Sequence, residues 1–313
     1  MTSDNRAGRS SDNIKDLWDH FQETGDSRDL ENLINLLRAA AASWEEGGEA
    51  DHFAALSNLG AALLSRADRT GAMEDLDEAI ALQRQALASM PDGHPGTVAA
   101  LSNLGSALLR RADRTRDLTN LDEAIAIQRR AVSLVEAGGG FDRTAALSNL
   151  GAALLSRAAR TGAIEDLDEA ISCQRQALAS TPSDRPDYIA CLSNLGDSLR
   201  LRFEQTGDVR SSSGAEQFSS FAAEALQVHE QLVLMRERML GPDHPSTLAS
   251  INNLAAVLQD QGDLERAREL HARVLASYIR TLGSDHPSTL ASLNNLAAVL
   301  QDQGDLERAQ ALY

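Results

Sequence analysis

The stretch that decides the fold is LSNLG at Leu56–Gly60. The same five residues occur three more times, at Leu101–Gly105, Leu147–Gly151 and Leu192–Gly196. Successive copies begin 45 or 46 residues apart. A nearly constant period of this length indicates structural repeats that stack on one another, rather than one globular core. The repeat is therefore the unit from which fold and function must be inferred.

The residues that follow LSNLG are repeated with it and have two halves. Leucines recur every three or four residues from Leu56 to Leu63, and apolar residues do the same from Leu76 to Leu87. This is the spacing of one helical face. Arg69-Thr70-Gly71 is typical of a helix end, and the acids that follow suit the positive end of a helix dipole. Each repeat is predicted to be a hairpin of a first and a second helix that turns at Gly71.

Small residues occupy fixed positions in both helices of the hairpin. These positions are Gly60, Gly105, Gly151 and Gly196 in the first helix, and Ala79, Ala124, Ala170 and Ala225 in the second. Glycine inside a helix costs about 1 kcal/mol relative to alanine, so its repetition indicates a packing reason. We expect the two helices to approach closely there.

This pattern of leucine and glycine in one helix and alanine in the next resembles the tetratricopeptide repeat, over nearly the whole chain. The resemblance implies an all-α fold, a right-handed solenoid of stacked helix hairpins. Two types of repeat are present. From about Phe221 the sequence LGPDHPSTLASINNLAAVLQDQGDLERAREL, starting at Leu240, returns nearly unchanged from Leu282 and resembles kinesin-light-chain repeats. The longer repeats resemble those of actinobacterial and fungal multidomain signalling proteins, where such arrays accompany a caspase-like protease or a nucleotide-binding switch domain.

The repeats divide the chain into five expected segments. They are a disordered tail at 1–12, a degenerate capping hairpin at 13–49, a long-period array at 50–207, a Ser-rich insertion or hinge at 208–220, and a kinesin-light-chain-like array at 221–313. The last helix is expected to begin at Leu306 and to be truncated at Tyr313. We therefore expect a fragment, or an end that another molecule covers.

Composition favours a soluble helical chain. Among 313 residues there are seven prolines and 4% aromatic residues. No apolar run reaches the roughly 18 residues of a membrane span, and the first residues do not resemble a signal peptide, so a cytoplasmic location without membrane contact is expected. Cys173 and Cys191 are predicted to be buried free thiols. The net charge of −17 argues against nucleic acid as a partner. It is explained either by acids that support the second helices or by an acidic groove for a basic peptide.

No constellation of residues indicates catalysis, a cofactor or a metal. The only lysine, Lys15, follows Ile14, so the Gly-Lys pair of a phosphate-binding loop is absent. His244 and His286 lie 42 residues apart in repeated Asp-His-Pro-Ser-Thr segments. Stacked helices hold equivalent positions about 10 Å apart, too far for one metal site. These segments are predicted to be helix starts, with aspartate or hydroxyl side chains as caps.

One asparagine recurs in the first helix of every full repeat. This asparagine series consists of Asn58, Asn103, Asn149, Asn194, Asn253 and Asn295. In tetratricopeptide families this position lies toward the concave surface, where the amide can hold the backbone of a bound peptide. The alternative is that the asparagine only orders the hairpins. The residues before it, among them Ser57 and Asn252, are expected to make the same inner stripe polar. Lysines that would clamp a terminal carboxylate are absent.

The leading hypothesis is a non-enzymatic scaffold that binds a peptide or protein segment in its concave groove. The alternative is a sensor or autoinhibitory arm of a larger signalling enzyme, a caspase-like protease or a nucleotide-binding switch, whose effector domain lies outside these residues. Catalysis by this chain itself is the weakest of the three hypotheses.

Overall fold

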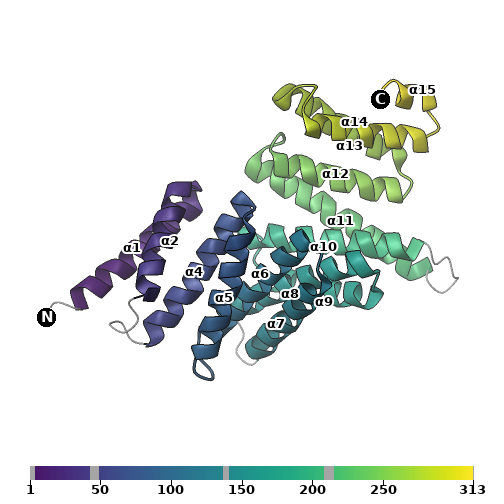
Figure 1. The fold of residues 1–313 in the computed structure, drawn as a ribbon. Helices are drawn as coiled ribbons and strands as arrows, with labels where there is room; N and C mark the ends of the chain where they lie inside the picture. Colours follow the sequence, from purple (N-terminus) through teal and green to yellow (C-terminus); the bar gives the residue numbers. More distant parts are fainter. Residues whose placement is uncertain (1–3, 43–48, 137–140, 208–214, 313) are drawn as a thin grey trace. The chain divides into compact units, whose positions relative to one another are not determined.

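The computed structural model describes residues 4–42, 49–136, 141–207 and 215–312, and within these ranges the chain is helical, with no strand. The helices pack as consecutive antiparallel pairs (Figure 1). The predicted all-α fold of helix hairpins is confirmed. Contacts between Cα atoms divide the chain into two compact units, Met1–Arg157 and Ala158–Tyr313. Each unit is described by itself below.

The first unit contains an opening hairpin and the first long repeats. Its helices are α1 (Asp4–Thr24), α2 (Ser27–Ala42), α4 (Glu49–Thr70), α5 (Met73–Ser89), α6 (Thr97–Thr115), α7 (Leu118–Glu136) and α8 (Phe141–Thr161), whose last turn belongs to the second unit. Each helix from α2 to α7 packs against its neighbour in sequence. Leu33, Ile34 and Leu63 are completely buried between α2 and α4. The aliphatic layers predicted from the leucine spacing therefore form the core of this unit.

The second unit contains the remaining long repeat and both short ones. Its helices are α9 (Ile164–Ser180), α10 (Pro186–Gly207), α11 (Ala215–Leu240), α12 (Pro245–Asp260), α13 (Leu264–Leu282), α14 (Pro287–Asp302) and α15 (Leu306–Gln310). α11 packs against both α10 and α12. Residues 208–214 of the expected Ser-rich hinge lie outside the described residues. The five-segment division of the chain, including a disordered tail where α1 begins at Asp4, stays a prediction.

Left-handed backbone ends the first helices where the sequence predicts a turn. Gly71 and Gly162 have φ of 79° and 72°. In the repeat between these two, the equivalent residue is Arg116, which adopts φ of 57°. It is the one non-glycine residue with positive φ in the described ranges. A side chain in this region costs about 1–2 kcal/mol, because Cβ crowds the following carbonyl oxygen. One turn in the array is thus strained.

The short repeats start their first helices with histidine caps. The Nδ1 atom of His244 accepts a hydrogen bond from the Ser246 backbone at 3.1 Å, and Pro245 is the first residue of α12. His286 caps α14 in the same way, through Ser288 at 3.1 Å. The predicted helix starts are confirmed, but the expected aspartate cap is wrong for Asp243. That carboxylate instead accepts hydrogen bonds from the side chains of Ser277 and Arg280 on α13.

Candidate functional site

In the first unit, the asparagine series lies on the first helices without internal partners. Asn58 on α4 is exposed, whereas Asn103 on α6 and Asn149 on α8 are half-buried. None of these three side chains makes a hydrogen bond to another described residue of the unit. Two to three turns further along, neighbouring first helices are joined by polar contacts, Arg110 to Asp68 at 2.6 Å and Ser156 to Asp113 at 2.8 Å. Within the described residues of the first unit, the three amides therefore make no contribution to hydrogen bonds between hairpins.

In the second unit, at least one asparagine of the series makes a hydrogen bond within the chain. Asn194 and Asn253 are half-buried and Asn295 is exposed. The Asn253 amide donates to Asp197 at 3.3 Å, which joins α12 to α10. At this position the asparagine does help to order adjacent hairpins.

The Asp197 carboxylate lies in a polar cluster between α10, α11 and α12. Burial raises the pKa of Asp197, and the charges of Arg200 and Arg236 oppose that shift. Arg236 on α11 donates to the Ser246 carbonyl at 3.1 Å and to the Ser250 hydroxyl of α12. Burial lowers the pKa of Arg236, so the three helices share partly desolvated charges of both signs.

Two of the residues that precede the asparagines, Ser57 and Asn252, face the second helix of their own hairpin. Ser57 is buried, and its hydroxyl lies 3.2 Å from Oε1 of Gln83 on α5. In return, Nε2 of Gln83 donates to the Ser57 carbonyl at 2.8 Å. Asn252 likewise faces the second helix, where its Oδ1 lies 3.2 Å from Nδ1 of His271. The expected polar stripe is therefore wrong for Ser57 and Asn252, which bridge the two helices of their own hairpins.

The repeated glycine makes room for this bridge. A Cβ added at Gly60 would lie 2.6 Å from Nε2 of Gln83, and one at Gly105 would lie 2.2 Å from Nε2 of Gln128. Gln128 donates to the Ser102 carbonyl at 3.1 Å, as Gln83 does to Ser57. The glycine thus makes space for a buried glutamine side chain, and does not serve only to bring the two helix backbones into contact. The recurrence of glutamine at this position was a sequence signal that the hydrophobic pattern did not reveal.

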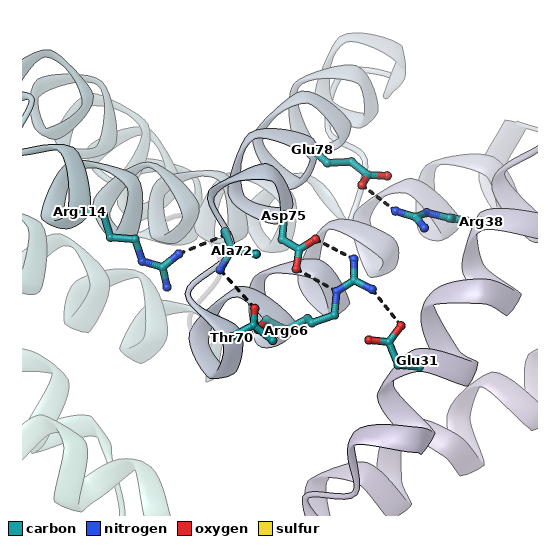
Figure 2. Close-up of polar contacts among 8 residues, drawn as sticks. All are labelled: Glu31, Arg38, Arg66, Thr70, Ala72, Asp75, Glu78 and Arg114. Carbon is teal, nitrogen blue, oxygen red and sulfur yellow. Dashed lines mark hydrogen bonds and ion pairs between the residues drawn. The ribbon is translucent and has the colours of Figure 1, made fainter.

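Arginines of the first helices bind acids of the preceding hairpin. Figure 2 shows Arg66 held by two contacts to Asp75 of its own hairpin and one to Glu31 of α2. The equivalent pairs are Arg66–Glu31 at 2.9 Å, Arg111–Asp77 at 2.8 Å and Arg157–Asp122 at 2.7 Å in the first unit, and Arg202–Asp168 at 2.7 Å in the second. We call these four pairs the arginine ladder. Part of the acidic charge is therefore neutralised within the fold.

Further pairs join one second helix to the next. In the first unit Arg38 on α2 binds Glu78 on α5 at 2.7 Å, and Arg84 on α5 binds Glu123 on α7 at 2.6 Å (Figure 2 shows the first pair). In the second unit Arg175 on α9 binds Glu224 on α11. The arginines of these pairs are more exposed than those of the ladder, and solvent screening limits each pair to less than about 1 kcal/mol.

The described ranges contain no candidate metal centre. No group of three or more His, Cys, Asp or Glu residues there is arranged to hold a metal ion. Cys173 and Cys191 are buried and are not joined in a disulfide, as predicted. Within the part of the chain that the structure describes, no helix has the length and apolar character needed to cross a membrane.

Known sequence families contain the same helix pairs, with small residues at the glycine and alanine positions. Tetratricopeptide repeat models match residues 53–96, 97–134 and 143–187, and a second set matches 214–270 and 247–313. The chain belongs to the tetratricopeptide repeat family. Among curated proteins, no sequence matches it.

Solved structures with this repeat are similar to the chain. A putative kinesin light chain from Podosopora anserina with nearly identical repeats has 26% identity and a TM-score of 0.53, over 70% of this chain and 93% of that one. A tetratricopeptide repeat protein from Parabacteroides merdae has 16% identity and a TM-score of 0.54, over 97% and 90%. A signal transduction ATPase from Pyrococcus horikoshii with a tetratricopeptide repeat sensor has 14% identity and a TM-score of 0.59, over 96% of this chain and 40% of that one. The last two show likeness of fold alone.

Proposed function

We propose that this tetratricopeptide repeat chain is a non-enzymatic scaffold that binds an extended segment of a protein partner along the asparagine series. The observation that supports this most is the unpartnered state of Asn58, Asn103 and Asn149 within the first unit. An amide side chain carries both a donor and an acceptor, so each can pair with the backbone of a bound segment. Repetition of one amide on successive first helices suits an extended peptide, whose backbone groups also repeat.

The charge of the chain supports a partner segment with basic residues. Asp197 and Asp260, on the first helices α10 and α12, both have pKa values raised by burial. The pKa of Asp260 is raised further by the neighbouring charge of Glu204. A lysine or arginine of the partner would relieve this like-charge repulsion. Binding should therefore weaken as salt is added. We expect no nucleic acid partner and a cytoplasmic location.

The test begins with a pull-down and mapping of the bound partner segment on overlapping peptides. The triple variant Asn58→Ala, Asn103→Ala and Asn149→Ala should then bind the mapped peptide about 10-fold or more weakly, because each lost hydrogen bond contributes about 0.5–1.5 kcal/mol. Its melting temperature should stay near that of the wild type.

The matched control changes exposed polar residues of the second helices, Gln85→Ala and Arg130→Ala, and should bind like the wild type. Unchanged affinity of the asparagine variant, with a lowered melting temperature, would show that the series serves the fold and would overturn the proposal.

A second candidate function is the sensor arm of a larger signalling enzyme. The similarity of fold to the repeat sensor of the Pyrococcus horikoshii ATPase favours it. The reading frame around these 313 residues tests it directly. A protease or nucleotide-binding domain encoded in the same frame would support the sensor, and a frame that encodes the repeats alone would exclude it.

A further inference from the structure

The bridge between the helices of a hairpin uses a different residue pair in each type of repeat. In the long repeats a serine faces a glutamine, as in Ser57–Gln83 and Ser102–Gln128. In the short repeat of α12 and α13, Asn252 faces His271. The hairpin of α10 and α11 lies where the two types meet. It combines the serine of the long type, Ser193, with the histidine of the short type, His229.

This mixed pair leaves His229 buried without a partner. The residue has no exposed surface, and neither ring nitrogen has a hydrogen-bond partner among the described residues. Its ring lies against Gly196 of α10, where an added Cβ would be 2.8 Å from Cε1 and 2.9 Å from Nε2. The ring therefore packs closely against the α10 backbone at Gly196. Two unpaired polar atoms in such a place cost free energy that Gln83, whose Oε1 and Nε2 are both hydrogen-bonded to Ser57, does not cost.

The groups around His229 give little support to a positive charge. Arg200 on α10 and Arg236 on α11 both act against a proton there, and α12 presents the uncharged Ser250 and Asn253 to the cluster. Asp197 on α10 is the nearby carboxylate, but it is already engaged by Asn253. On the far side, α9 contacts α11 through Arg175, whose charge is paired with Glu224. A proton on His229 would therefore be accommodated only if the ring reached water.

We propose that the α10–α11 hairpin is a proton-operated joint, which opens when His229 takes up a proton. Burial lowers the pKa of His229 from 6.5 to about 4, against a weaker opposite effect of the Gly196 backbone. In an opened hairpin the exposed ring regains its ordinary pKa, so acid favours the open form. Between pH 7.5 and pH 5, the ratio of open to closed hairpins rises about 30-fold for these two pKa values.

Opening of this joint would act on the asparagine series of the second unit. Asn194 lies on α10 and Asn253 lies on α12. α11 follows α10 and precedes α12 in the chain, and it packs against both of them. Separation of α10 from α11 would also strain the Asn253–Asp197 bond. This consequence for binding rests on the proposed function, whereas the joint itself does not.

Hydrogen exchange of the whole chain, followed by mass spectrometry at pH 7.5 and pH 5, tests the joint. After correction for the intrinsic pH dependence of exchange, amides of α10 and α11 should open about 30-fold more often at pH 5, while those of α4 to α7 should change far less. His229→Gln installs the residue that Gln83 and Gln128 provide in other hairpins. It should remove the pH dependence.

A second variant and a direct titration keep the test decisive. Ser193→Asn retains the histidine but supplies the partner that Asn252 gives to His271, and should reduce the pH dependence. If His229→Gln keeps the acid response of the wild type, the joint does not depend on His229. If nuclear magnetic resonance titration of the wild type gives His229 a pKa near 6.5, the closed hairpin does not exclude the proton. Either result would overturn the proposal.

Discussion

Arg66 and Asp75 form a two-point ion pair, with Nε to Oδ2 at 2.8 Å and Nη2 to Oδ1 at 2.7 Å. The Asp75 side chain is only 8% exposed. The hydrogen bonds that Arg66 donates to Asp75 are the largest cause that raises the pKa of Arg66. The remaining nitrogen of Arg66 binds Glu31 of the preceding hairpin, so one side chain joins two repeats (Figure 2).

Removal of this arginine should destabilise the first unit. In Arg66→Ala the Asp75 carboxylate remains buried without its partner, and we expect a loss of about 1–3 kcal/mol in urea unfolding. The double variant with Asp75→Asn should recover part of this loss, because Asn120 occupies the equivalent position beside Arg111. A double variant no more stable than Arg66→Ala would show that the charge of Asp75 is not the cause.

Substitution of the repeated glycine should destabilise the hairpin even though alanine favours helix. In Gly105→Ala the new methyl group would meet Gln128 at 2.2 Å, so the glutamine must leave its site and the Ser102 carbonyl loses its donor. We expect a loss of about 1–3 kcal/mol. Combining Gly105→Ala with Gln128→Ala removes the overlap and should recover more than half of it. Thermal unfolding followed by circular dichroism measures both effects.

Relief of the strained turn should stabilise the chain. Arg116→Gly places glycine where Gly71 and Gly162 stand in the neighbouring repeats, and should add about 0.5–1 kcal/mol. The reverse change, Gly71→Arg, should remove a similar amount. Equal melting temperatures for the wild type and Arg116→Gly would contradict the assignment of strain to this backbone.

The contribution of His20 to stability should change with pH in the direction opposite to that of His229. Its Nδ1 lies 2.5 Å from Asp29, and the hydrogen bond to Asp29 is the main cause that raises its pKa above 6.5. Because the folded pKa is the higher one, this stability is complete below pH 6.5 and is lost as pH rises through the folded pKa. Nuclear magnetic resonance titration should show the raised value in the wild type. In Asp29→Asn the pKa of His20 should fall, and an unchanged value would refute the pairing.

The fold could be predicted from the sequence because the helices and the turns between them follow from the spacing of apolar residues and glycines. The leucine period predicted the helices, and Gly71 predicted the turn between them. Contacts of single polar side chains were harder to predict. The acids after Gly71 were interpreted through the helix dipole, whereas Asp77 binds Arg111, 34 residues further along the chain. Nothing in a repeat period tells which later residue a carboxylate will meet. The role of the asparagine series likewise stays a prediction, since it depends on a molecule that is not part of the chain.

The arginine ladder has a consequence for how the gene can change. Every arginine of the ladder pairs with an acid of the preceding hairpin. The hairpin that carries the arginine also contains an equivalent acid, which pairs with the arginine of the following hairpin. An in-frame deletion of one whole period would bring Arg111 opposite Glu31, and a duplication would add one more matched pair. Recombination between repeats therefore preserves the ion pairs at every junction it creates. Such a chain can lengthen or shorten during evolution without first acquiring compensating substitutions.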